Sequence, residues 1–281
     1  MDKVTAAAET AHAGDLVRRH RLSTRLWHWT NAVTLLVMLM SGLMIFNAHP
    51  RLYWGEYGAN ADRAWLEIGA SRQGQGMLRI GTAVVKTTGV LGVWKNPEGE
   101  IKRRAFPWWA TIPSNYSLAD ARLWHLAFAW VLAVGLLLYL LWSLVNGHLH
   151  RDLHITGKEW RPSHVWHDVK QHARLRFPTG AAALRYNVLQ KLAYAFVLFV
   201  ALPLMILTGL GMSPGTDAWA PLVTELFGGR QSARSIHFIL AIALIGFFVV
   251  HIAMVILAGP VNEVRSMITG MYRLPREKQD D

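Results

Sequence analysis

The sequence predicts an all-α integral membrane protein, built as a bundle of four transmembrane helices. Of its 281 residues, 52% are hydrophobic, and these gather in four long apolar blocks. Each block reaches the roughly 20 mostly apolar residues that a helix needs to cross about 30 Å of hydrocarbon. The predicted spans are about Leu26–Phe46, Leu118–Val145, Leu189–Met212 and Ile236–Ala258.

Polar segments divide the rest of the chain. Residues 1–22 are expected to form an N-terminal tail, and residues 261–281 a C-terminal tail. The membrane domain, residues 23–260, also contains the segment 47–117 between the first two spans and the segment 146–188 between the second and third. The 47–117 segment is too long for a simple connection, so we expect a partly ordered cap or binding surface there.

The distribution of basic residues predicts the orientation. The net charge is +11, and Lys and Arg gather before the first span, in segment 146–188 and after the fourth span. The segment between the third and fourth spans holds only two, Arg230 and Arg234. This positive-inside distribution indicates a multi-pass membrane protein, with both termini cytoplasmic and segment 47–117 extracytoplasmic. It favours contact with lipid over nucleic acid.

Two kinds of site are excluded by the sequence. The chain has no cysteine, which excludes disulfides, covalently attached c-type haem and Cys-ligated iron–sulfur or zinc sites. Gly74, Gly76 and Gly81 are spaced as in a phosphate-binding loop, but Thr82-Ala83 stands where Lys-Ser/Thr should follow. A metal must therefore be held by His, Met or oxygen ligands.

Four histidines stand in the predicted membrane helices. The string Arg-Leu-Trp-His occurs twice, ending at His28 and His125, each time where an apolar block begins. The same spacing recurs before His237, and His251 follows fourteen residues later. Fourteen residues of helix turn through about 1400°, about 40° short of four full rotations, and rise about 21 Å. His237 and His251 are thus predicted to share one helix face at two depths, and such histidines are functional candidates.

The topology pairs these histidines by depth. The first two spans run in opposite directions, so His28 is predicted near the inner surface and His125 near the outer one. This gives an outer pair, His125 with His237, and an inner pair, His28 with His251, as expected for the axial ligands of two b-type haems. Tetrahedral zinc fits poorly because about 21 Å separates the two levels. His49 is the competing candidate for an outer ligand.

Four further residues are predicted in the haem environment. Gly42 lies fourteen residues after His28, where a missing side chain would let a porphyrin approach; helix–helix contact is the alternative. Arg25, Arg122 and Arg234 each lie one helical turn before a predicted ligand, where a guanidinium can pair with a haem propionate. Interfacial anchoring is the alternative, and it is favoured for Arg25.

These motifs resemble the bacterial cytochrome b561 and Ni,Fe-hydrogenase b-type cytochrome family, which includes the formate dehydrogenase gamma subunit. Within it, the chain is most similar to cytochrome b subunits of the thiosulfate reductase type. The resemblance covers most of residues 18–270, but the long 47–117 segment departs from the hydrogenase and formate dehydrogenase pattern. The matching motifs are Arg25-Leu-Trp-His28-Trp-x-Asn31, Ser41-Gly42, Arg122-Leu-Trp-His125, Asn146-Gly-His148 to Asp152-Leu153, Leu207-Thr-Gly209 and His237-x13-His251.

The resemblance implies a dihaem cytochrome b of the bacterial cytoplasmic (inner) membrane that passes electrons between the quinone pool and an extracytoplasmic partner. That partner would be a molybdopterin oxidoreductase of the sulfite-oxidase type or a c-type cytochrome, docked on segment 47–117. It also implies a quinone site near the inner haem. The candidates for that site are Asn31, Asn146, His148 and Arg151.

Two alternatives remain open. A stand-alone superoxide oxidase that reduces quinone would need a basic funnel at the outer haem, which Lys102, Arg103 and Arg104 could supply. A haem-free, proton-coupled transporter would use the intramembrane histidines as a proton relay.

Overall fold

The computed structural model of the protein describes residues 14–147, 154–157, 159–173 and 187–274. Two of the quinone candidates, His148 and Arg151, lie outside these residues.

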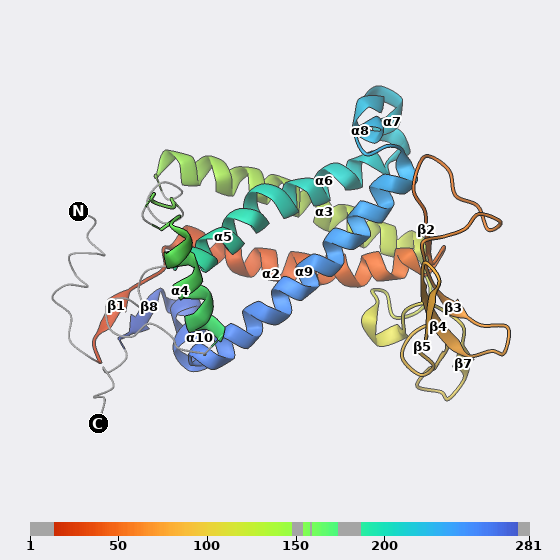
Figure 1. Cartoon of the computed structure of the whole chain (residues 1–281), viewed down its shortest axis with the longest axis horizontal. Helices are drawn as coiled ribbons and strands as arrows, with labels where there is room; N and C mark the ends of the chain where they lie inside the picture. The colour runs from red at the N-terminus through yellow and green to blue at the C-terminus, as the bar shows by residue number, and fades with distance from the viewer. Residues whose placement is uncertain (1–13, 148–153, 158, 174–186, 275–281) are drawn as a thin grey trace. The chain divides into compact units, whose positions relative to one another are not determined.

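Four helices are long and apolar enough to cross a membrane, as the sequence predicts (Figure 1). The first and fourth begin somewhat earlier than the predicted spans, and the fourth is one unbroken helix. They are α2 (Leu22–Phe46), α3 (Leu118–Val145), the composite span Val188–Gly211 and α9 (Arg230–Ala258).

The third span is built from three pieces. Helix α5 (Val188–Phe196) passes into a π segment, η4 (Val197–Ala201), and then into α6 (Leu202–Gly211). Asn187 begins it with a capping box, in which its side chain accepts a hydrogen bond from the backbone of Gln190. The π segment ends two residues before Pro203, which has no backbone N–H and clashes with the preceding helical turn.

The contacts within the chain define two compact units. The first comprises residues 1–30, 135–201 and 244–281, and the second comprises residues 31–134 and 202–243. Each unit is described separately below.

In the first unit, a pair of short strands joins the two ends of the described chain. Strand β1 (Leu16–Arg18) pairs antiparallel with β8 (Met271–Arg273). The ion pair Arg19–Glu263, at 2.9 Å, supports this pairing, and the Arg19 guanidinium lies over the ring of Tyr272. Because β1 precedes the first span and β8 follows the last, both ends lie on the same side of the spans.

Two amphipathic helices complete the first unit, α4 (Pro162–Ala173) and α10 (Pro260–Thr269).

An ion pair connects the third span to the segment before α4. The Lys191 ammonium of α5 donates to the Glu159 carboxylate at 2.8 Å. Burial alone would raise the pKa of Glu159, but the hydrogen bonds from Lys191 and Thr156 lower it to about 2.

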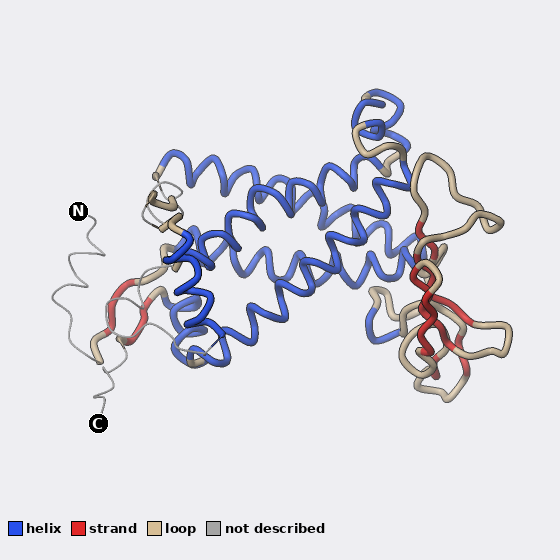
Figure 2. The backbone as a smooth tube through the Cα atoms, in the orientation of Figure 1, coloured by secondary structure: helices blue, strands red, loops and turns tan. Residues whose placement is uncertain are grey.

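In the second unit, residues 47–117 form a β-rich domain, which we call the cap (Figure 2). The prediction of an all-α protein is therefore wrong for this segment. Gly81, with φ +58°, closes the tight β4–β5 turn, and a Cβ at Gly76 would lie 2.2 Å from the Leu91 carbonyl oxygen. The glycines that resemble a phosphate loop thus serve the turns and packing of a sheet.

The cap contains two sheets. One has the order β2-β3-β4-β5, and the other pairs β6 with β7. The bounds are β2 (Arg51–Leu52), β3 (Leu66–Ala70), β4 (Gly76–Ile80), β5 (Ala83–Lys86), β6 (Trp94–Lys95), β7 (Ile101–Lys102) and the 3-10 helix η1 (Trp108–Ala110).

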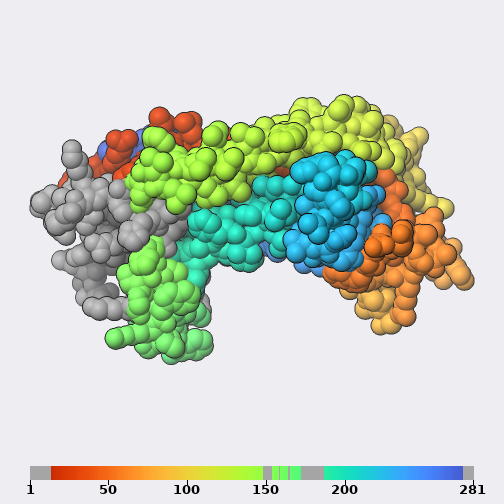
Figure 3. Space-filling model, turned by 90° about the horizontal axis from the view of Figure 1, so that it is seen from above, coloured from red at the N-terminus to blue at the C-terminus, as the bar shows by residue number. Residues whose placement is uncertain are grey.

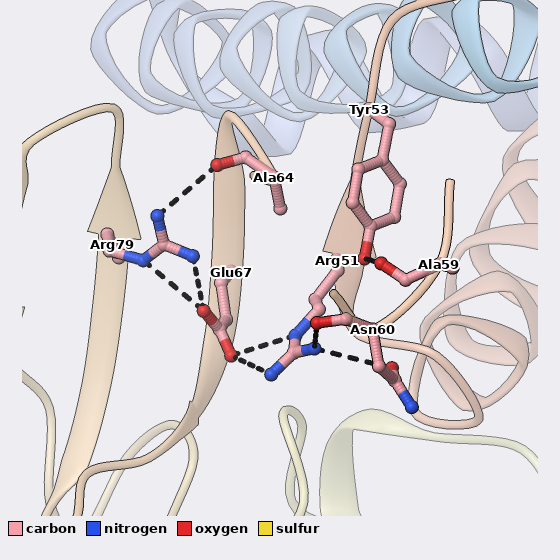
Figure 4. A network of polar contacts seen from close by, with 7 residues as sticks. All are labelled: Arg51, Tyr53, Ala59, Asn60, Ala64, Glu67 and Arg79. Atoms are coloured by element: carbon pink, nitrogen blue, oxygen red, sulfur yellow. Dashed lines mark hydrogen bonds and ion pairs between the residues drawn. The ribbon is translucent and has the colours of Figure 1, made fainter. Parts of the chain in front are cut away.

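Glu67 joins three strands of the larger sheet. The register places it directly opposite both Arg51 and Arg79. Its carboxylate accepts from Arg51 Nε at 2.9 Å and from Arg79 Nε at 3.2 Å (Figure 4). Burial would raise the pKa of Glu67, but the bonds from Arg79 and Arg51 hold it below its ordinary value.

Hydrogen bonds join the cap to the first turns of α9 (Arg230–Ala258). Trp65 Nε1 donates to Ser235 Oγ at 2.9 Å, and Gly55 N donates to Ser232 Oγ at 2.7 Å. Figure 3 shows the orange residues of the cap beside the blue residues that precede α9 in the chain. Two short helices precede α9, namely α7 (Pro214–Trp219) and α8 (Pro221–Glu225). The hydrophobic core of the cap also reaches Phe238, the residue after His237.

Candidate functional site

The second unit brings together His125 of α3 and His237 of α9. Their ring centroids lie 6.3 Å apart with the planes at 61°. The Nδ1 of His125 lies 3.1 Å from the Met38 carbonyl oxygen and 3.1 Å from Ser41 Oγ. The Nδ1 of His237 lies 2.9 Å from Thr208 Oγ1. Within the described chain neither Nε2 makes a hydrogen bond, so each remains free to bind a metal.

A glycine follows each of these hydroxyl residues. A Cβ on Gly42 would lie 3.3 Å from Cε1 of His125, and one on Gly209 would lie 3.7 Å from Cε1 of His237. The structure therefore gives Gly42 a neighbour that the sequence did not predict. The absent side chain admits the imidazole of His125 from the adjoining helix.

The first unit brings together His28 of α2 and His251 of α9. Their ring centroids lie 6.2 Å apart with the planes at 54°. Phe247 stacks on His251 at 6.1 Å and 14°. The Nδ1 of His28 is buried and has no hydrogen-bond partner. Both histidine pairs are those that depth matching predicts, but only the first has polar support at Nδ1 within the described residues.

The spacing in each pair fits one metal ion between two imidazoles. A histidine nitrogen binds a metal at about 2 Å and lies about 1 Å from its ring centre, so opposed ligands place the ring centres about 6 Å apart. No group of three or more His, Cys, Asp or Glu in the described part of the chain could hold a metal. A metal in either pair would therefore need further ligands from outside these four residue types, and the four nitrogens of a porphyrin could supply them.

His49 is not joined to either pair by any described contact. Its ring stacks on Tyr53 at 5.7 Å, and its carbonyl oxygen accepts a hydrogen bond from Arg234. Burial, followed by the nearby charges of Arg234 and Arg51, lowers the pKa of His49. This competitor of the predicted outer ligands belongs instead to the junction between the cap and α9.

The three predicted propionate partners occupy different surroundings. Arg25 donates to the Ile268 carbonyl oxygen, and its Nε is buried without a partner. Arg122 is exposed, while the Arg234 guanidinium lies 5.6 Å from the Phe46 ring centre. Among the described residues, none of the three arginines pairs with a carboxylate.

Of the quinone candidates, the structure describes Asn31 and Asn146. Asn31 lies one turn after His28 on α2, and its Oδ1 is buried without a hydrogen-bond partner. Asn146 directly follows α3, where Gly147 with φ +67° redirects the chain. The residues predicted for the site do not include Ser41 or Thr208. A hydroxyl residue followed by glycine within an apolar block is the signal that could have identified them.

A family model described as prokaryotic cytochrome b561 matches residues 19–270. The chain belongs to this family. Resemblance to it was predicted from the sequence motifs, and that prediction is confirmed. Membership implies b-type haem and a role in electron transport within a membrane, which the haem-free transporter alternative does not satisfy.

Relatives of this cytochrome b561 include subunits of different oxidoreductases. One, named as a protein-methionine-sulfoxide reductase subunit (YedZ1) of Azospira oryzae, is 33% identical over 141 residues, which cover 50% of this chain and 67% of the relative. Another, named as a Ni/Fe-hydrogenase B-type cytochrome subunit of Azotobacter vinelandii, is 27% identical over 179 residues, covering 59% and 74%. No solved structure gives a significant match.

Proposed function

We propose that this cytochrome b561 holds two b haems and passes electrons between the quinone pool and an oxidoreductase outside the cytoplasmic membrane. The observation that carries the proposal is the pair of histidine sites, with ring separations of 6.3 and 6.2 Å. His125 and His237 would hold the outer haem, and His28 and His251 the inner one. Haem supplies reversible one-electron iron chemistry, and two axial histidines leave no open position for a substrate.

The arginines near these sites would hold the propionates. Arg234 is a partly buried guanidinium with no carboxylate partner among the described residues, and it lies one turn before His237. A propionate would supply the missing anion. Arg122 stands in the equivalent position before His125, and Arg25 before His28.

The cap is the proposed docking surface for the partner. Its core packs on Phe238, and its hydrogen bonds end on the turn of α9 that precedes His237. A partner on the cap would therefore lie close to the outer haem. The cap carries nine Lys and Arg against five Asp and Glu, which favours a partner with an acidic docking face.

The relatives are named as subunits of oxidoreductases, and for this chain we propose a molybdopterin enzyme as the partner. A c-type cytochrome with an acidic face could bind the same surface of the cap. Copurification with the tagged, full-length protein, followed by molybdenum and c-haem analysis, distinguishes the two partners.

Quinone is proposed to react at the inner haem. The buried Asn31 Oδ1 has no partner in the described structure, and a quinol hydroxyl is a donor of the kind it needs. Asn146, His148 and Arg151 remain the candidates on the segment after α3. Histidine and asparagine near the water interface suit a reaction that also moves protons.

The first test is a haem count on the purified, full-length protein in detergent. A pyridine haemochromogen assay is expected to give two b haems per chain. His125→Ala and His251→Ala should each leave one haem, and the control His49→Ala should leave both. A single haem in the wild type contradicts the dihaem assignment. No haem in folded protein, made with adequate haem supply, overturns the proposed function.

The superoxide oxidase alternative receives less support from the cap. Lys102 pairs with Glu100 at 2.7 Å, and the Arg104 guanidinium lies over the ring of Tyr116 at 4.1 Å. Two of the three residues of the supposed basic funnel therefore have partners in the cap. Stopped-flow mixing with superoxide, without any partner protein, is expected to reduce the haems slowly compared with a quinol; rapid reduction by superoxide would establish the alternative.

A further inference from the structure

The outer histidine pair has a polar support that repeats on two helices. Ser41-Gly42 of α2 lies against His125, and Thr208-Gly209 of α6 lies against His237. Both hydroxyl residues are completely buried. The two dipeptides are alike in chemistry, a hydroxyl beside Nδ1 and a glycine beside the ring, although they belong to different helices.

The hydroxyl protons are already committed to the helix backbone. Ser41 Oγ donates to the Val37 carbonyl oxygen at 2.7 Å, and Thr208 Oγ1 donates to the Leu204 carbonyl oxygen at 2.7 Å. Each hydroxyl has one proton and further acceptor lone pairs. Toward the histidine, each oxygen is consequently an acceptor.

The acceptors around Nδ1 determine which nitrogen of each ring carries the proton. Nδ1 of His125 is 3.1 Å from the Met38 carbonyl oxygen, which can only accept. Nδ1 of His237 lies 2.9 Å from Thr208 Oγ1, whose own proton is donated to the Leu204 carbonyl oxygen. With only acceptors around Nδ1, the stable tautomer of each ring is Nδ1–H, and Nε2 keeps its lone pair.

The His28–His251 pair lacks this arrangement in the described chain. Nδ1 of His28 is buried without a partner, and His251 makes ring contacts but no described hydrogen bond. The two pairs have similar ring separations, so they differ in the hydrogen bonding of Nδ1 and not in the spacing of the rings.

We propose that Ser41 and Thr208 are positioning residues that fix Nε2 of His125 and His237 as iron ligands and lower the reduction potential of the outer haem. This inference rests on the proposed function, since it takes His125 and His237 as axial ligands. A hydrogen bond donated by Nδ1–H makes the imidazole a stronger electron donor, and a stronger donor favours ferric over ferrous iron. The polar support therefore biases the outer haem toward the oxidised state.

The test uses the full-length, haem-loaded protein with single substitutions. Ser41→Ala and Thr208→Val remove one hydroxyl each, and Thr208→Ser restores the hydroxyl without the methyl group. Thr34→Val is the matched control, because Thr34 is a buried hydroxyl residue on α2 with no described bond to a histidine. Haem content, potentiometric titration and low-temperature electron paramagnetic resonance of the oxidised protein are measured on every variant.

We expect Ser41→Ala and Thr208→Val to raise the midpoint potential of one haem and leave the other unchanged. A tenfold loss in the preference for ferric iron corresponds to 59 mV for this one-electron couple. The low-spin resonance of the same haem should shift, while Thr208→Ser and Thr34→Val retain the wild-type values. Selective loss of one haem from a folded variant also supports positioning.

Three results would overturn the inference. These are unchanged potentials and resonances in both hydroxyl-deleting variants, equal shifts of both haems, or a shift equally large in Thr34→Val. None of them affects the proposed function, whose haem assignment fails if the wild-type protein lacks the two haems. The two failures are therefore distinguishable in one set of samples.

Discussion

The imidazole rings of His125 and His237 each lie against a glycine of a neighbouring helix. The space for an added side chain is smaller at Gly42 than at Gly209. At Gly42 an added Cβ would come within 3.3 Å of the His125 ring, which is tighter than ordinary van der Waals contact. At Gly209 the corresponding distance to the His237 ring is 3.7 Å, which is ordinary contact. A methyl group should thus disturb one histidine and not the other.

We expect Gly42→Ala to displace the His125 ring by a few tenths of an ångström. Overpacking of this kind costs about 1–3 kcal/mol. The variant should bind the outer haem less tightly, with a lower ratio of haem to protein and a lower unfolding temperature. Gly209→Ala, the matched variant, should keep two haems per chain. Equal haem loss in both variants would contradict this account.

At the residue scale, the sequence predicts the histidines better than their surroundings. Spacing and topology identify the two pairs that the structure brings to 6.2 and 6.3 Å. The hydroxyl–glycine motifs mark Ser41 and Thr208, but the motifs do not say which histidine each would contact, because both lie far along the chain from those histidines. Helix periodicity describes one helix at a time, and these contacts depend on which helix lies beside which.

At the scale of elements, the cap illustrates what hydrophobic patterning misses. The four long helices follow from apolar length alone, and their observed bounds lie near the predicted ones. The strands of the cap have two to five residues each. Such short strands carry little periodic signal, and their sheet depends on glycine turns and on long-range partners such as Arg51 and Glu67.

Glu67 should be the most sensitive charged residue of the cap. Glu67→Gln removes the anion between Arg51 and Arg79, and a partly buried group left without its partner costs about 1–3 kcal/mol. We expect a lower unfolding temperature at pH 7. Glu100→Gln is the control, because the Lys102–Glu100 pair is largely exposed and should leave stability unchanged.

The same comparison has a defined pH dependence. The folded protein lowers the pKa of Glu67, so its charged form adds stability above the pKa of the unfolded chain, about 4.3. That stability is lost as the pH falls from this value through the lowered folded pKa. The difference in unfolding temperature between wild type and Glu67→Gln should therefore shrink on acidification. A difference that grows toward low pH would contradict the role assigned to Glu67.

At the scale of the whole molecule, topology is the property to test. An even number of membrane-length helices predicts that both termini lie on one side of the membrane, and the pairing of residues 16–18 with residues 271–273 supports this prediction. The basic residues predict that this side is the cytoplasm. A fluorescent protein fused after Asp281 is thus expected to fluoresce. Alkaline phosphatase inserted at Gly99, in the exposed turn between β6 and β7, should be active. The reverse pattern would invert the proposed sites for quinone and partner.

The pairing of β1 with β8 also has a consequence for biosynthesis. A ribosome completes β1 before the first span and β8 only after the fourth, so β1 must wait unpaired while every membrane helix is made. Arg19 and Glu263, which join beside these strands, meet equally late. Formation of the β1–β8 pair consequently requires that all four spans have been inserted with alternating directions. A chain with one span left out would hold β1 and β8 on opposite faces of the bilayer.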